Sequence, residues 1–130
     1  MSFKAKLKVG GKEYNILNCS YALHQEVDAT GRASSVTRGG RIDIEVESTG
    51  ESTFFEWMTN SFERKDGSIV FIKRDTDATL KELKFEEGYL VKFKENFEST
   101  GRLPLSETFT ISARAIEMGN GSFENEWTPS

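Results

Sequence analysis

The chain has 130 residues, of which 36% are hydrophobic and 29% charged. These values exclude a disordered chain and predict one folded domain over residues 1–130. The net charge of −4 argues against nucleic acid as a partner. A single cysteine, Cys19, excludes an internal disulfide. The first residues alternate lysine with apolar side chains, unlike a signal peptide, and no later stretch is long enough for membrane insertion. We therefore expect a protein that folds in a cytoplasm.

Alternation of apolar and polar residues, which is typical of half-buried strands, dominates the sequence. The first strand, residues 3–9, is expected to turn at Gly10-Gly11 into a long second strand over 12–27. A third strand is predicted over 41–48, with its isoleucines and valine inward. Further strands are predicted over 68–74, 79–87, 89–97, 107–118 and 122–127. Gly88 is expected to form a tight turn or a bulge between two of these strands.

One segment has a helical period instead. Its apolar residues, Phe54, Trp57, Met58 and Phe62, fall on one helical stripe and are predicted to pack inward. Thr53 and Glu56 have the spacing of a capping box, and Asp66-Gly67 has the composition of a turn. We therefore predict a helix over 53–64.

These elements predict a mainly β fold. The chain has only two prolines, Pro104 and Pro129, so no predicted strand contains a residue that cannot donate to its ladder. The expected architecture is a β-barrel or tight sandwich of about seven or eight antiparallel strands with one flanking α-helix. No linker or internal repeat divides it.

The sequence offers no convincing reactive site. His24 is the only histidine, and no catalytic triad can be assembled around it. Cys19 and His24 face opposite sides of the expected strand, so they cannot share a metal ion. Asp75 and Asp77 flank a turn without the spacing of a calcium loop. We predict no catalytic residue, no cofactor and no metal, and hence no enzyme.

Two rows of like charge lie on different predicted strands. Lys4, Lys6 and Lys8 line one strand face, and Asp43, Glu45 and Glu47 line another. Each row is either simply solvated or meets the other row, within one sheet or across a subunit boundary. The six residues are therefore candidate subunit-interface charges.

Residues 28–41 interrupt the sheet with a segment that has almost nothing to bury. The segment holds one acid and three arginines, so it is locally positive on an acidic protein. Loops of this length are uncommon unless they are functional or disordered. Its arginines can bind carboxylates on another surface, and its glycines let the backbone leave the barrel and return. The candidate contact residues are Asp28, Gly31, Arg32, Ser35, Arg38, Gly39, Gly40 and Arg41.

Several stretches together resemble one family, and they cover essentially the whole chain in the expected order. They are DATGR at 28–32, GGRIDIEVES at 39–48, FFEWM at 54–58, TLKELKFEEGYLVKFKENF at 79–97 and FTISARAIEMGNGSFENEW at 109–127. Their concurrence resembles the tube protein of type VI secretion systems, the Hcp (TssD) family, in its Bacteroidetes-type branch.

The resemblance implies a structural subunit. Proteins of this family form a β-barrel related to phage tail tubes, assemble into hexameric rings and stack the rings into a hollow tube. A loop after the second strand reaches the neighbouring ring, which matches residues 28–41. The implied partners are other copies of the chain, effector proteins in the lumen, and the sheath, spike and baseplate of the machine. The protein is expected to assemble in the bacterial cytoplasm and then to leave the cell through the machine.

Two other functions fit the same pattern of strands. A small-ligand-binding β-barrel would enclose an apolar molecule, although large inward aromatics would fill its cavity. A carbohydrate-binding β-sandwich would expose Trp57 or Trp127. Both alternatives predict a monomer.

Overall fold

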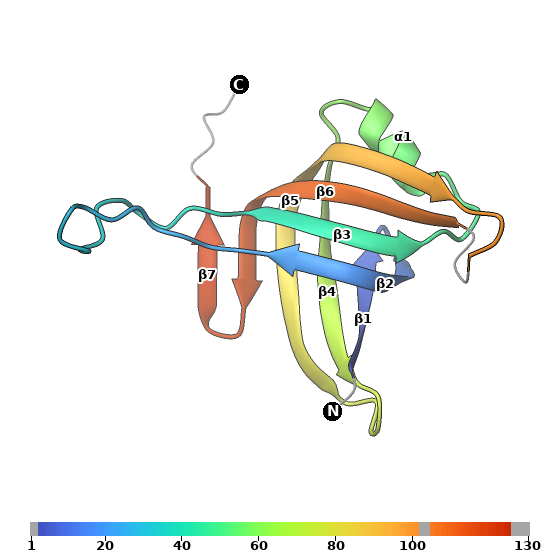
Figure 1. The fold of residues 1–130 in the computed structure, drawn as a ribbon, viewed down its shortest axis with the longest axis horizontal. Helices are drawn as coiled ribbons and strands as arrows, with labels where there is room; N and C mark the ends of the chain where they lie inside the picture. Colours follow the sequence, from blue (N-terminus) through green and yellow to red (C-terminus); the bar gives the residue numbers. More distant parts are fainter. Residues whose placement is uncertain (1–2, 102–104, 126–130) are drawn as a thin grey trace.

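Six antiparallel strands close into a barrel in the computed structural model, which describes residues 3–101 and 105–125 (Figure 1). The strand order is β3-β2-β1-β4-β5-β6, and pairing of β3 with β6 closes the barrel, while β7 adds to β6. The elements are β1 (Phe3–Val9), β2 (Lys12–Tyr21), β3 (Arg41–Glu47), α1 (Thr53–Thr59), β4 (Arg64–Lys73), β5 (Thr79–Phe97), β6 (Leu105–Met118) and β7 (Gly121–Glu124). The predicted mainly β fold with one flanking helix is confirmed, with seven strands in the described ranges.

Alternation along the strands delivers one apolar set of side chains to the interior. In β3, Ile42, Ile44 and Val46 are buried, as the sequence predicts. The other buried members of the core are Leu7, Val9, Tyr14, Phe54, Trp57, Ile69, Leu83, Phe85, Leu90, Phe109, Ile111, Ala113 and Ile116. Burial of a large apolar side chain stabilises a fold by about 1.5–3 kcal/mol, so this shared interior is what holds the strands together.

Aromatic rings fill the interior beneath α1. The ring of Phe54 stacks on Phe109 of β6 with 4.3 Å between centroids, and it tilts against Tyr14 of β2 at 4.8 Å. These aromatic rings fill the space that a ligand-binding barrel would leave open, and they are part of the core. Trp57 is also buried, which removes it as the exposed tryptophan of a carbohydrate-binding site. Trp127 lies outside the described residues.

The helix is shorter than predicted because its C-terminal residues form a turn. The backbone N–H of Asn60 bonds back to Glu56 and Trp57, and Glu63 N–H donates to Asn60 O at 3.0 Å. Trp57 Nε1–H donates to the carbonyl of Glu63 at 2.9 Å, which holds this turn against the core. The chain then enters β4 at Arg64, where the prediction still had helix.

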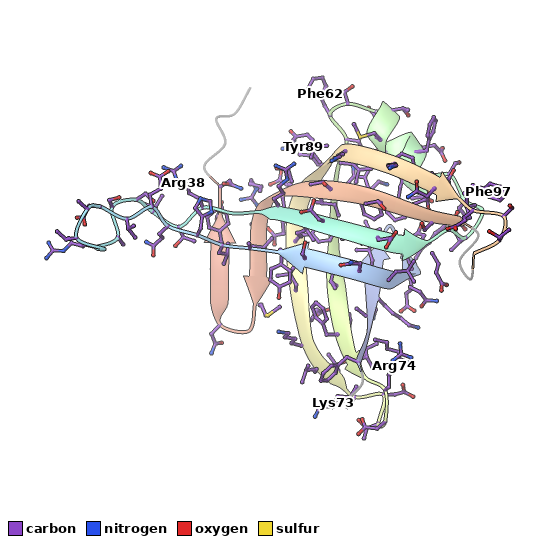
Figure 2. The ribbon with its side chains drawn as sticks, viewed as in Figure 1. Arg38, Phe62, Lys73, Arg74, Tyr89 and Phe97 are labelled. Atoms are coloured by element: carbon purple, nitrogen blue, oxygen red, sulfur yellow. The ribbon has the colours of Figure 1, made fainter. Side chains whose placement is uncertain are left out.

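The inward face of the helix is correspondingly smaller than predicted. Phe54 and Trp57 are buried and Met58 is partly buried against the core. Phe62 is 83% exposed, so its predicted inward packing is wrong (Figure 2). The predicted capping box is wrong as well. The N-cap is Ser52, whose hydroxyl donates to the Glu56 carboxylate at 2.6 Å and accepts no hydrogen bond from a backbone N–H of the helix.

Two predicted turns lie inside strands. Asp66-Gly67 belongs to β4, where a Cβ on Gly67 would come within 2.6 Å of Lys8 O. The predicted strands 79–87 and 89–97 are one continuous strand, β5. The β4–β5 register shifts between Lys65 and Gly67, and Glu87 has a φ of 50°. Of the two interpretations of Gly88, the bulge is therefore confirmed and the turn is wrong.

Replacing Trp57 with alanine is expected to lower the free energy of unfolding by about 3–5 kcal/mol, because it removes a buried ring and leaves a cavity. Phe62→Ala is the matched control. It removes an exposed ring, so it should change the unfolding free energy by no more than about 0.5 kcal/mol. Urea denaturation followed by circular dichroism measures both. An equal loss in the two variants would mean that the helix continues through residue 62.

Candidate functional site

Residues 22–40, here called the extension, leave the barrel as a narrow ribbon between β2 and β3 (Figure 1). Its two arms are joined by backbone hydrogen bonds. His24 and Arg38 exchange N–H···O=C bonds of 3.0 and 2.7 Å, and Val27 and Ala33 form a second bridge. The extension is therefore an ordered element and not the disordered excursion that the sequence left open.

The extension begins earlier than predicted. The predicted second strand ran to residue 27, but β2 ends at Tyr21, which pairs with Ile42. The ladder ends there because Gly40 has a φ of 96° and directs its carbonyl to β6, where Ala113 N–H donates to it at 2.7 Å. Arg41, predicted in the loop, is the first residue of β3.

A single carboxylate organises the tip. Asp28 Oδ1 accepts hydrogen bonds from the Thr30 N–H at 2.9 Å, the Thr30 hydroxyl at 2.7 Å and the Arg32 N–H at 3.1 Å. Gly31 between them has a φ of 86°, a conformation that glycine adopts without strain. The hydrogen bonds from Thr30 and Arg32 lower the pKa of Asp28 below its ordinary value of 3.8.

Other polar side chains brace the arms. The Ser35 hydroxyl accepts from the Glu26 N–H at 2.9 Å, and Gln25 donates its amide to Ser35 O at 3.0 Å. Arg38 Nε lies 3.7 Å from the Glu26 carboxylate, so its charge is partly compensated inside the extension. Arg32 has no such ion pair with any described residue. Of the two arginines within the extension, Arg32 is thus the one presented outward.

The base of the extension is fixed by a residue that the sequence analysis missed. Asn125, just after β7, donates its side-chain amide to Gly39 O at 3.2 Å and Ala113 O at 3.0 Å. A Cβ on Gly40 would lie 2.6 Å from that amide and 2.7 Å from Ala113 O, so only glycine fits. No periodic signal marks Asn125, because its role depends on β7 folding back beside β6.

The charged rows of β1 and β3 do not meet within the subunit, because β2 lies between them. The lysines pair elsewhere: Lys4 with Asp77 at 3.0 Å, and Lys6 and Lys8 with Glu13 at 3.7 and 3.6 Å. The acidic row accepts hydrogen bonds from neutral side chains: Thr110 to Asp43 at 2.6 Å, and Ser106 to Glu45 and Asn15 to Glu47, both at 3.5 Å. The interpretation that the rows join in one sheet is wrong, and contact across a subunit boundary stays a prediction.

The described ranges contain no group of three or more histidine, cysteine, aspartate or glutamate side chains placed to hold a metal ion. Burial, together with the nearby Asp43 carboxylate, raises the pKa of the Cys19 thiol to about 11, so this thiol is protonated at neutral pH. No helix in residues 3–101 and 105–125 combines the length and apolar character that crossing a membrane requires.

The chain matches a known family over nearly its full length. The family model for hemolysin coregulated protein Hcp (TssD) matches residues 1–128. Among solved structures, Hcp1 from Flavobacterium johnsoniae is 66% identical, with a TM-score of 0.89 over 94% of this chain and 99% of that chain. No curated protein matches.

Two solved structures with lower identity share the fold. Hcp1 from Salmonella typhimurium is 15% identical with a TM-score of 0.74, over 95% of this chain and 92% of that chain. A chain of the PVC sheath-tube complex, an extracellular contractile injection system in its extended state, is 18% identical. Its TM-score is 0.55, over 88% of this chain and 87% of that chain.

Asp28→Ala is expected to release the tip of the extension and leave the melting temperature of the barrel unchanged, because Asp28 contacts only the tip. Asp28→Asn keeps an acceptor oxygen at the same position and should retain most of the order. Hydrogen exchange of peptides covering residues 28–32 measures the difference. Fast exchange in wild-type protein at pH 7 would contradict the role given to Asp28.

The same tip should respond to pH in one direction. Because the folded pKa of Asp28 is lowered, its stabilising effect is complete above the ordinary value near 3.8 and is lost as the pH falls through the lowered folded value. Exchange rates corrected for intrinsic chemistry should therefore rise only in strong acid. The Asp28→Asn variant, which does not titrate there, should lack this rise.

Proposed function

The chain belongs to the Hcp (TssD) family and is a subunit of a type VI secretion tube; from that premise we propose that the extension stacks one ring on the next. The observation that carries this proposal is an ordered ribbon that projects from a closed barrel and contributes no side chain to the buried core. A segment that is ordered yet dispensable for the core is suited to a contact with another subunit.

We infer that six subunits form each ring. Closed rotational symmetry lets each subunit use one pair of complementary surfaces repeatedly. Within the described residues β7 pairs on one side only, with β6, so its second edge remains available to a neighbour. Head-to-tail stacking of such rings gives an open tube.

The charged rows supply a second candidate contact within the ring. Lys4, Lys6 and Lys8 lie on the outer face of β1, and the acidic row lies on the outer face of β3. Since β2 separates the rows within a subunit, they can meet only where two subunits adjoin. Exposed ion pairs contribute about 0–1 kcal/mol each, so their effect on the ring should be cumulative and sensitive to salt.

Further partners follow from the place of a tube in a contractile machine. We infer that the hollow tube carries effector proteins, that the sheath surrounds it, and that it joins the spike and baseplate. As a type VI tube protein the chain is secreted, and we infer that assembly takes place in the bacterial cytoplasm before export. Co-purification of effector and sheath proteins with tubes from a producing cell tests these contacts.

The ring should contain six subunits. Native mass spectrometry at micromolar concentration is expected to give about 88 kDa, six times the 14.7 kDa of one chain. Lys6→Glu and Asp43→Lys should each weaken the ring at low salt, and the double variant should recover part of the loss if the rows meet.

A stable monomer would overturn the ring and favour one of the monomeric alternatives. If the losses in the double variant are additive, the two residues are not coupled. That result would not argue against a ring of six subunits. Raising the salt concentration serves as an internal control, since it should shrink the single-variant effects.

Reversing the charge of the extension should abolish stacking and preserve folding. Arg32→Glu, alone or with Arg38→Glu, is expected to leave the ring mass and melting temperature unchanged but to prevent tube formation and secretion, because neither residue contacts the core. Electron microscopy of tubes and a cell-based secretion assay are the measurements.

Arg74→Glu is the matched control, because Arg74 follows β4 at a position far from the extension (Figure 2). It reverses one exposed positive charge and should leave tubes and secretion intact. Persistence of tubes in the Arg32→Glu variant would show that stacking uses another element.

A further inference from the structure

The two ends of β3 differ in charge and point toward opposite ends of the molecule. β3 begins beside the extension, and its last residue, Glu47, pairs with Ser106 near the start of β6. There Phe97, the last residue of β5, pairs with Leu105. Figure 2 shows Arg38, in the extension, and Phe97 on opposite sides of the barrel along the long axis. We propose, on the premise that the extension stacks rings, that its tip binds a groove at this opposite end of a second copy of the chain.

The groove is assembled from four strands and the segment that follows β5. It encloses about 410 Å³ and is lined by Leu17, Glu45, Asn96, Phe97, Glu98 and Ser106. Two of these side chains are large, apolar and exposed: Leu17 at 36% and Phe97 at 74%. Two others are carboxylates, and none of the six is basic. The groove thus combines two exposed apolar side chains with two carboxylates.

The extension offers the complementary surface. Val27 and Val36 are 62% and 77% exposed, although both are apolar. Arg32 lies at the tip with no ion pair among the described residues, and its backbone N–H is held by Asp28. Apolar contact with Phe97 would bury these valines, and an arginine can bind a carboxylate through two parallel hydrogen bonds. Arginine is enriched among the residues that dominate interfaces, so Arg32 is the expected anchor of this contact.

Electrostatics at the groove end favour a positively charged occupant. Glu95 and Glu107 are directly opposed across β5 and β6. Burial of Glu107, together with the charge of Glu95, raises the pKa of the Glu107 carboxyl. Lys12, the first residue of β2, lies at the groove end of that strand, and it is already paired with Glu51 at 3.0 Å. An arginine from the next ring would meet the groove carboxylates Glu45 and Glu98, whereas contact between two groove ends would bring like charges together.

Cysteine cross-linking tests the contact directly. In full-length protein that carries Cys19→Ser, one preparation carries Ala33→Cys at the tip and the other Asn96→Cys in the groove. Under mild oxidation, the mixture should give a disulfide-linked heterodimer on a denaturing gel and paired rings by native mass. Thr76→Cys, on the turn between β4 and β5, replaces Asn96→Cys as the control and should give at least about tenfold less product.

Charge exchange separates this proposal from the stacking function on which it rests. Arg32→Glu and Glu98→Lys should each lower the cross-link yield about tenfold, and the double variant should restore it. Glu98 is used because Glu45 also belongs to the acidic row. Loss of tubes with Arg32→Glu but not with Glu98→Lys, with no cross-link to Asn96→Cys, would overturn the groove and leave the stacking function intact. Tubes that survive Arg32→Glu would overturn the stacking function itself.

Discussion

Pairing between β3 and β6 is the constraint on which the rest of the molecule depends. Seven residue pairs, from Arg41↔Ser112 to Glu47↔Ser106, turn an open sheet into a closed barrel and bring Ile44 over Phe109. The same ladder fixes what lies at its two ends. The extension is attached at Arg41, and the groove forms around the other end, near Phe97. Since β3 is hydrogen-bonded on both sides, to β2 and to β6, it sets the distance and direction between the two surfaces.

The filled interior suits a structural subunit. Phe54 and Phe109 occupy the space that a binding barrel would leave open, and Trp57 closes it beneath α1. Interiors packed in this way have low compressibility and transmit strain, whereas a cavity would let the wall deform. A subunit of a stacked tube benefits from such a rigid core. Its specific contacts can then be placed on the ends and edges, where they do not disturb folding.

The extension shows how a segment without a core can still be ordered. Local hydrogen bonds of Asp28 order its tip, the distant Asn125 holds its base, and its apolar side chains remain exposed. These polar bonds fix its shape before any partner arrives, which reduces the conformational entropy lost on binding. The exposed valines and Arg32 then remain available for the contact itself.

The sequence by itself determined most of the strands, the inward face of β3, the buried pair Phe54 and Trp57, and the presence of a positive segment that has no core of its own. These features follow from local periods and turn residues, which are visible along the chain. Only the tertiary structure decided where α1 ends, because β4 pairs with β5 from Arg64 onward and leaves Phe62 in solvent. It also decided that Gly88 is a bulge in one long strand and that β2 separates the charged rows. The groove and the role of Asn125 were likewise beyond the sequence, since each joins residues far apart in the chain through pairings that no local pattern specifies.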